Sequence, residues 1–396
     1  MKKELWIHID SYRPNVDAPA NRAFAFARFF SEAGYKINII TNGDENRIEY
    51  RTEATVYYLK NKYVKKRKRI VGRLLENISF AFATRKFLEK NKKTIKDSIF
   101  ILSIPEYISG LSCLKVKRYC AKFIVDVRDI WPEVAVEMGT FSSKSFKAKV
   151  FRFIADKYYK KCDLLMTVSS RKTDTLKRIT KHAFDDKIVW IGNGYDISMT
   201  ELISDPSVLN KYDLKNKTIV SYIGNIGHAQ HLISLLEYAK EIQTESNKVF
   251  IISGKGSELD FLKKYSIDNN IQNVIFTGQV SKEQAKAITL ASKISFISLM
   301  SDKMVDSVPT KLFESLGIGV PVLLVANGEA CDILNKTGLG VSLLPSKIDE
   351  LHNAFQFIED NYEKIILNKN KAIKLMSTEY ARNKYCHDLQ KILEKI

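Results

Sequence analysis

Asp306-Ser-Val-Pro-Thr-Lys-Leu-Phe-Glu314, followed by Ser-Leu-Gly-Ile-Gly-Val-Pro-Val-Leu-Leu-Val, has the pattern of a polar loop, a helix, a turn and an apolar strand. The start of such a helix has free backbone N–H groups and the positive end of the helix dipole, so it can bind an anion. Lys311 adds a mobile cation, and the carboxylates of Asp306 and Glu314 can accept hydrogen bonds from sugar hydroxyls. An ordinary α/β loop with surface charges is the alternative, because a fold-level pattern does not establish function.

The size and charge of the chain indicate how many domains it has and which partners it meets. At 396 residues the chain exceeds what one hydrophobic core normally supports, so we expect two domains. Residues 1–190 hold 40 Lys and Arg against 21 Asp and Glu, whereas residues 191–396 hold 23 against 24. The N-terminal half therefore carries the whole net charge of +18. We expect it to meet a polyanion, either nucleic acid or an anionic membrane surface.

The densest basic segment, residues 60–73, has eight cations and no acid. Residues 74–87 follow it with an apolar helical pattern. Basic residues beside such a helix suit the interface of an anionic bilayer, where each cation contributes about 1 kcal/mol. A solvated lysine-rich loop is the alternative. The predicted membrane contacts are Lys65, Lys66, Arg67, Lys68 and Arg69.

Any membrane contact is expected to be peripheral. No stretch approaches the roughly 18 uninterrupted apolar residues that span a bilayer, and residues 1–10 are too short and polar a start for a signal peptide. The five cysteines are scattered, with no pair at metal-ligand spacing. We therefore expect a reduced, cytoplasmic protein without a metal site.

Apolar runs bounded by turn residues alternate with helical periodicity, which is typical of parallel sheets covered by helices. The expected strands are 4–9, 36–41, 54–59, 98–103, 122–127, 163–168 and 187–191, then 218–223, 248–253, 273–277, 294–298, 320–325 and 340–344. The expected helices of the first half are 18–34, 74–91, 107–120, 143–161 and 170–180.

This alternation predicts an α/β protein of two doubly wound, Rossmann-like domains. We expect residues 1–192 to form the first domain, 193–375 the second, and 376–396 a C-terminal helix that crosses back to the first. Residues 205–216 are polar and rich in turn formers, which is typical of a linker.

Doubly wound domains bind ligands at the carboxyl ends of their strands. Residues 222–231, Tyr-Ile-Gly-Asn-Ile-Gly-His-Ala-Gln-His, follow an expected strand, so Gly224 and Gly227 can let the backbone approach a phosphate. Gly254-Lys-Gly-Ser-Glu258 and Asn273-Val-Ile-Phe-Thr-Gly278 lie at the next two strands. The succession of these loops is a stronger signal than any one glycine pair.

In the N-terminal half, Asp126-Val-Arg-Asp-Ile-Trp-Pro-Glu133 ends an expected strand with acids, an arginine and a tryptophan. An ion-paired turn is the alternative to a functional loop here. Together, RDIWPE (128–133), GNIGHAQ (224–230) and VPTKLFE (308–314) resemble the retaining glycosyltransferases of family 4. They are similar to a bacterial branch that builds O-antigen, capsule and related polysaccharides and includes L-fucosamine transferases. The resemblance covers nearly the full length.

The resemblance implies a GT-B fold, in which the two domains face a cleft, and transfer with retention of anomeric configuration. A nucleotide-sugar donor, most simply a UDP-sugar, would bind the C-terminal domain, and no metal or other cofactor would be required. The N-terminal domain would take a lipid-linked saccharide of the undecaprenyl-diphosphate type at the inner face of the bacterial cell membrane. Nucleic acid is not an expected partner. The donor sugar and the choice of UDP or GDP stay open.

The resemblance also implies roles for single residues. Glu314 would bind the ribose, Asp306 or Glu329 would orient the sugar, and Lys311 would neutralise phosphate. The implied catalytic residues are Asp129, Arg128, Lys311 and Asp306. The implied donor-binding residues are Gly224, Asn225, Gly227, His228, Gly254, Lys255, Gly278, Ser307, Thr310, Lys311, Glu314 and Glu329. The implied acceptor residues are Asn15, Arg22, Trp131 and Glu133.

Four positions depart from the family pattern. Asn225 and Gln230 stand where most members carry an arginine and a lysine that face the diphosphate. Asp306 replaces a commoner glutamate, and Arg128 lies roughly where many members have a histidine. Because fixed donors stabilise the charge that develops on a departing phosphate, the loss of two cations makes Lys311 the leading candidate for this role.

Two other functions are compatible with part of the sequence. A nucleotide-sugar epimerase of the same fold would need an acid/base set, for which Asp10, His228 and His231 are loose candidates. A nucleic-acid-binding protein would explain the charge. However, the sequence has no interleaved aromatic and basic pattern on strands and no recognition-helix motif.

Overall fold

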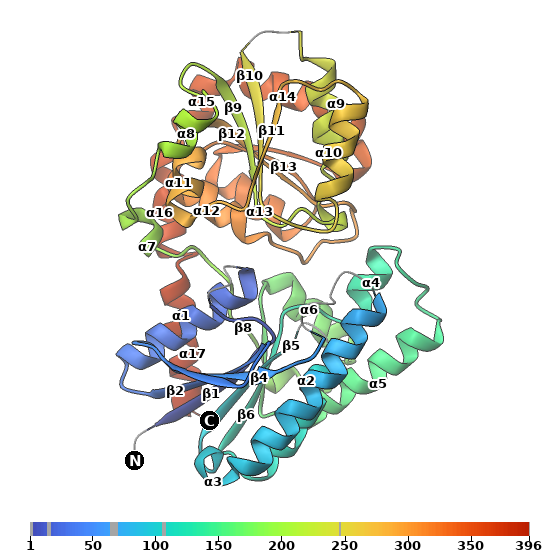
Figure 1. Ribbon diagram of the computed structural model, residues 1–396, viewed down its shortest axis with the longest axis vertical. Coiled ribbons are helices and arrows are strands. Elements are labelled where there is room, and N and C mark those ends of the chain that lie inside the picture. The colour runs from blue at the N-terminus through green and yellow to red at the C-terminus, as the bar shows by residue number, and fades with distance from the viewer. Residues whose placement is uncertain (1–2, 14–16, 64–69, 105–107, 245–246, 396) are drawn as a thin grey trace. The chain divides into compact units, whose positions relative to one another are not determined.

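The computed structural model (Figure 1) describes residues 3–13, 17–63, 70–104, 108–244 and 247–395. The chain divides into two compact units. The first is Met1–Asn193 together with Tyr385–Ile396, and the second is Gly194–Lys384. Each unit has its own sheet with helices on both faces, which confirms the predicted α/β class with two doubly wound domains. In the described part of the chain, no helix is long and apolar enough to cross a membrane.

The first unit contains an eight-stranded sheet with the order β3-β4-β2-β1-β5-β6-β7-β8. Its strands are β1 Glu4–His8, β2 Lys36–Gly43, β3 Arg47–Tyr50, β4 Thr55–Lys60, β5 Ile99–Ile104, β6 Lys122–Val127, β7 Leu164–Thr167 and β8 Ile188–Trp190. Pairing is parallel except between β3 and β4. Strand β3 was not predicted, because this edge strand is mostly exposed and lacks an apolar run.

Helices cover both faces of this sheet. They are α1 Ala18–Glu32, α2 Ile70–Lys90, α3 Lys92–Ile95, α4 Glu133–Glu137, α5 Phe146–Lys161, α6 Ser170–Ile179 and the 3-10 helices η2 Ser109–Arg118 and η3 Asp185–Lys187. Residues of α2, η2 and α5 share one buried cluster with Trp6, whereas α1 shares the other with Leu5 and Ile7. Alternate residues of β1 thus face opposite layers, as the pleat of a strand requires.

The last helix of the chain, α17 Arg382–Lys395, contributes to the core of the first unit. Its buried residues Tyr385, Cys386, Leu389 and Leu393 join the cluster that α1 covers. The first unit is therefore built from both ends of the sequence.

The second unit contains a parallel six-stranded sheet with the order β11-β10-β9-β12-β13-β14. Its strands are β9 Thr218–Ile223, β10 Lys248–Ser253, β11 Val274–Gly278, β12 Ser292–Ser298, β13 Val322–Val325 and β14 Gly340–Leu343. Strands β10 and β11 follow β9 on one side of the sheet, and β12, β13 and β14 follow on the other side of β9. The strand order therefore reverses between β9 and β12, and a doubly wound sheet binds its ligands at this switch point, beyond the carboxyl ends of the strands.

The helices of the second unit lie on both faces of its sheet (Figure 1). They are α7 Ser198–Glu201, α8 Ser207–Lys211, η4 His228–Gln230, α9 Ile233–Glu241, α10 Leu259–Asp268, α11 Lys282–Ala291, α12 Thr310–Ile318, α13 Glu329–Thr337, η5 Pro345–Glu350, α14 Leu351–Asp360, α15 Tyr362–Ile366 and α16 Lys369–Thr378.

The prediction of a linker at 205–216 was wrong. This segment contains α8, which packs on α11 inside the second unit. Val208 and Leu214 are buried there in one cluster with Ile219 and Ile288. The polar composition favoured the prediction of a linker, because only a few residues of the segment are apolar and buried.

Candidate functional site

The loops that follow β9, β10 and β11 contact one another through backbone atoms. The N–H of Gly224 donates to the carbonyl of Ser253 at 2.9 Å, and the N–H of Gly254 donates to the carbonyl of Gly278 at 2.8 Å. A Cβ atom on Gly254 would lie 1.8 Å from the Gly224 oxygen. Gly224 and Gly254 also have φ of 146° and 142°, which side chains disfavour. Glycine at both positions therefore keeps the backbone of this edge accessible to a ligand.

A second backbone contact joins the loops after β12 and β13. Gly328 has φ of 78°, and a Cβ atom on it would lie 2.1 Å from the Val305 oxygen. The N–H of Glu329 donates to that same oxygen at 3.0 Å. Asp306 follows Val305 directly, and both Asp306 and Glu329 are buried. The structure thus brings these two predicted carboxylates to adjoining loops.

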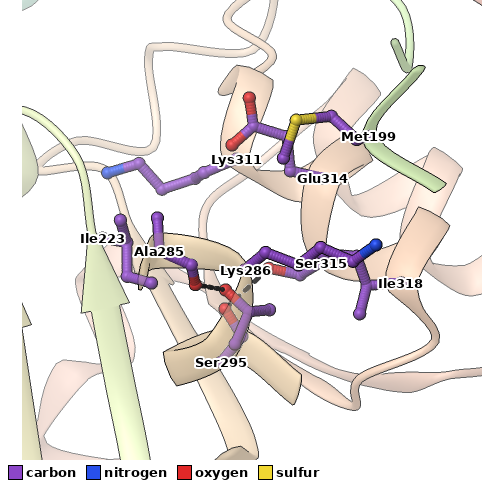
Figure 2. A pocket seen from close by; sticks show the side chains of 10 residues that line it. Met199, Ile223, Ala285, Lys286, Ser295, Lys311, Glu314, Ser315 and Ile318 are labelled. Carbon is purple, nitrogen blue, oxygen red and sulfur yellow. Dashed lines mark hydrogen bonds between the residues drawn. The ribbon is translucent and has the colours of Figure 1, made fainter. Parts of the chain in front are cut away.

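Lys311 extends from the first turn of α12 toward the end of β9, over Ile223 (Figure 2). Its Nζ lies 3.6 Å from the centroid of the Tyr222 ring. A Cβ atom on Gly224 would lie 3.0 Å from the same nitrogen. Burial lowers the pKa of Lys311 to about 7, although the Glu314 charge acts in the opposite direction. No described residue forms an ion pair or hydrogen bond with this amine.

The start of α12 adds donors beside this lysine. Pro309 precedes the helix, and no side chain caps its first turn within the part of the chain that the structure describes. N–H groups of an uncapped first turn carry the positive end of the helix dipole. The amide of Thr310 and the amine of Lys311 therefore form a candidate anion site at the switch point.

Glu314 lies one turn further along α12, beside Lys311 (Figure 2). Burial raises the pKa of its carboxyl, and the charges of Arg382, Lys282 and Lys311 offset part of this rise. None of the residues described here donates a hydrogen bond to it. Glu314 and Lys311 line one small pocket of about 30 Å³. This volume suits water rather than a nucleotide, so a nucleotide would have to lie over the open loops.

Asn225 and Gln230 replace the two expected cations with an amide pair. The Asn225 Nδ2 donates to the Gln230 Oε1 at 3.1 Å, and the N–H of Gly227 donates to the same oxygen at 3.1 Å. These contacts close the first loop on itself. His228 and Lys255 are exposed beside it.

The first unit has a polar cluster at the carboxyl ends of β1, β6 and β7. Arg128 is 9% exposed, its Nη2 lies 3.5 Å from the Asp10 Oδ1, and its Nε has no hydrogen-bond partner among the described residues. Lys172 is buried, with its Nζ 3.7 Å from the Oδ1 of the half-exposed Asp129. Arg128 and Asp129 are predicted site residues, whereas Lys172 was not predicted; its signal is a lysine in the first turn of α6 after a buried strand.

Arg22 of α1 also reaches the carboxyl end of β6, and its guanidinium is fully engaged. Its Nη2 pairs with the Asp126 Oδ1 at 2.9 Å, and its Nη1 donates to the Gly192 carbonyl at 3.1 Å. Both side chains of the ion pair are buried, at 5% and 2% exposure. Removing one partner of such a pair leaves an uncompensated buried charge. This geometry favours a structural role for Arg22 over the predicted acceptor contact.

Two other predicted acceptor residues, Trp131 and Glu133, contact α5. The Trp131 ring packs on Phe151 with centroids 5.5 Å apart, and the Glu133 Oε1 accepts from the Arg152 Nε at 2.9 Å. Asn15 and the predicted membrane residues Lys65 to Arg69 lie outside the described residues. Among those that are described, no group of three or more His, Cys, Asp and Glu could hold a metal ion.

A known family model matches part of the chain, within the second unit. Residues 206–384 match the family model described as Glycosyl transferases group 1. WbjE of Pseudomonas aeruginosa, named as a glycosyltransferase, is 21% identical over 231 residues, or 57% of this chain and 56% of WbjE. WcaI of Escherichia coli K12, named as a colanic acid biosynthesis glycosyl transferase, is 24% identical over 184 residues, or 44% of each chain. The chain thus spans about half the length of the curated relatives it matches.

Solved structures match the whole chain. Sucrose-phosphate synthase from Thermosynechococcus elongatus has a TM-score of 0.76 at 13% identity, and the match covers 100% of this chain and 99% of the synthase chain. HepE of Anabaena, in complex with UDP and glucose, has a TM-score of 0.74 at 14% identity and covers 100% of both chains. WaaG, a lipopolysaccharide glycosyltransferase, has a TM-score of 0.72 at 12% identity and covers 96% of this chain and 98% of its own. The chain has the GT-B fold of these proteins.

The pKa of Lys311 predicts a pH-dependent stability. From pH 7 to 10.5, the unfolded chain keeps a proton on this lysine that the folded protein has released, so the free energy of unfolding rises with pH. The expected gain between pH 7 and pH 9 is about 2 kcal/mol. Urea denaturation at several pH values should show that Lys311→Met removes this gain, whereas Lys303→Met, on an exposed residue of the preceding loop, keeps it. Equal pH slopes in the wild type and Lys311→Met would contradict the lowered pKa of this amine.

Proposed function

We propose that the protein is a retaining glycosyltransferase that moves a sugar from a UDP-sugar onto a lipid-diphosphate-linked acceptor in bacterial surface polysaccharide synthesis. The observation that carries the proposal is the pairing of Lys311 with the uncapped start of α12 at the switch point of the second sheet. The match of this unit to the group 1 family and the names of WbjE and WcaI support the reaction class. The HepE structures with UDP or UDP-glucose support a UDP-sugar donor.

The donor's diphosphate would bind the amide of Thr310 and the Lys311 amine. The Glu314 carboxylate already acts on this amine, and an anion here would add a second opposite charge, which would raise the lysine pKa again. The charge on the diphosphate grows as the sugar leaves, so donors that are already fixed in place stabilise the transition state more than the ground state. Lys311 would therefore act on the reaction rate as well as on binding.

Glu314 would accept hydrogen bonds from the ribose hydroxyls. Its carboxyl has no donor from the described residues, so a ribose hydroxyl would give this half-buried group a hydrogen-bond partner. Asp306 and Glu329 would orient the sugar, because the contact between Gly328 and Val305 holds their two loops together.

The acceptor would use the polar cluster of the first unit. Arg128 has a buried Nε without a partner among the described residues, which suits an anionic or oxygen-rich group. Asp129 is half exposed and can receive a proton or a hydroxyl hydrogen bond. We assign the buried Lys172 to positioning Asp129.

The first unit would bind an anionic bilayer peripherally. The apolar pattern of α2 divides between the core and the solvent, because Phe80 is buried whereas Phe82 is 67% exposed. A second aromatic face, not recognised in the sequence, lies on α5, where Phe146 and Phe153 are 81% and 62% exposed. Val150 lies between them on the same face of the helix. Exposed lysines surround this face, at Lys144, Lys147, Lys149, Lys157 and Lys160.

A first prediction tests the donor site. Glu314→Ala should weaken binding of UDP and of the UDP-sugar by about 1.5–3 kcal/mol, or roughly 10- to 150-fold, because a charge-assisted hydrogen bond to the ribose is lost. Isothermal titration calorimetry measures this directly, and UDP release from a panel of UDP-sugars measures transfer. Glu237→Ala, on an exposed residue of α9, is the matched control and should bind as the wild type does. Unchanged affinity in Glu314→Ala would remove this residue from the site.

A second prediction tests the membrane surface. The double variant Phe146→Ser, Phe153→Ser should lose binding to anionic vesicles in flotation assays, because it removes two exposed aromatic groups that would enter the interface. Phe261→Ser, Phe357→Ser makes the same chemical change at equally apolar exposed positions of the charge-balanced second unit, and this control should float as the wild type does. Rising salt should also release the wild type. Equal flotation of both double variants would rule out the α5 face.

A further inference from the structure

A cavity of about 170 Å³ lies in the first unit, between the end of α2, α3 and the end of η2. Lys92 and Tyr119 line it just before β5 and β6 begin. The polar cluster of Arg128 and Asp129 follows the other end of β6, which is a strand of six residues. The two places are thus separated by about 20 Å along the strand. The cavity belongs to the opposite edge of the sheet from the candidate acceptor site.

The lining of this cavity is rich in cations. Arg85, Lys92, Lys115 and Arg118, all of them exposed at its mouth like the single carboxylate Glu89, line it. The Glu89 Oε1 already accepts from the Arg85 Nε at 3.0 Å. Lys92, Lys115 and Arg118 form no ion pair with any residue that the structure describes. Three like charges around one cavity repel one another, and a bound anion would relieve this repulsion.

The neutral side chains of the lining can also donate. Burial raises the pKa of Tyr119 to about 12, so its hydroxyl keeps its proton at neutral pH. The Lys92 Nζ lies 5.6 Å from the centroid of the same ring, which places this amine beside the hydroxyl-bearing side chain. Ammonium, guanidinium and phenol groups together match the oxygens of a phosphate, and arginine does so with two parallel donors.

We propose that this cavity is a second ligand site, which binds a phosphate-bearing anion independently of glycosyl transfer. Its volume is below the roughly 300–1,000 Å³ of clefts that enclose drug-sized ligands, so it would hold a phosphate or diphosphate group rather than a whole nucleotide. The headgroup of an anionic phospholipid and a free phosphorylated metabolite present the same chemistry here. The site would let such an anion anchor or regulate the first unit without competing at the donor loops.

The test compares two variants of the full-length protein that lose the same charge. Lys115→Ala, Arg118→Ala removes two cations of the lining, whereas Lys93→Ala, Lys96→Ala removes two exposed cations of the same surface that do not line the cavity. Calorimetric titration with pyrophosphate and with inorganic phosphate probes a free anion. Flotation with phosphatidic acid vesicles, against phosphatidylglycerol vesicles of equal charge, probes an exposed phosphomonoester headgroup. Binding of pyrophosphate at the donor loops is common to both variants and cancels in the comparison.

We expect the lining variant to lose at least tenfold in affinity in one of the two arms, with less than a twofold change in the control. A loss in titrations of free anion would assign the site to a soluble ligand, and a loss confined to phosphatidic acid vesicles would assign it to a headgroup. Unfolding midpoints that match the wild type would show that both variants are folded. The proposal is overturned if neither arm shows saturable binding tighter than about 1 mM, or if both variants weaken binding equally.

Discussion

The carboxyl edge of the second sheet depends on backbone contacts that leave no room for a side chain. Cβ atoms would lie 1.8 Å from the Gly224 oxygen if placed on Gly254, and 2.1 Å from the Val305 oxygen if placed on Gly328. Because of these contacts, the loops after β9 and β10 form one layer, and the segment before α12 is held against the start of α13. A side chain at either glycine would separate the loops, so the contacts determine where every candidate donor-binding group lies.

These contacts hold the loops against which Lys311 packs. Its amine lies over the face of Tyr222 beside the glycine loop, and desolvation there lowers its pKa to about 7 against the opposing charge of Glu314. The amide pair of Asn225 and Gln230 adds no charge to the site. An anionic ligand would therefore stabilise the arrangement, and the donors that receive it are already fixed. We infer that the strongly basic first half of the chain serves other anions, at a membrane surface and in the cavity beside α3.

Much of the fold was predictable, because its strands are apolar runs between turn residues. Strands β6, β9 and β10 occupy the predicted ranges 122–127, 218–223 and 248–253. The glycines of the predicted donor site lie at the ends of these and the neighbouring strands, and the donor role of their loops stays a prediction. What the sequence could not supply are contacts between distant segments. The sequence around Arg22 does not show whether its side chain binds a ligand or Asp126, which is 104 residues away. The exposed face of α5 and the cations around the cavity depend in the same way on which side of a helix is buried.

A crystal structure of the protein with UDP is the most direct test of the central claim. The proposed donor site predicts diphosphate oxygens within hydrogen-bond distance, about 2.7–3.2 Å, of the Lys311 amine and the Thr310 amide. It also predicts a ribose hydroxyl on the Glu314 carboxylate. A nucleotide bound away from α12, with Lys311 still on the Tyr222 ring and no phosphate near it, would contradict the assignment of this edge as the donor site.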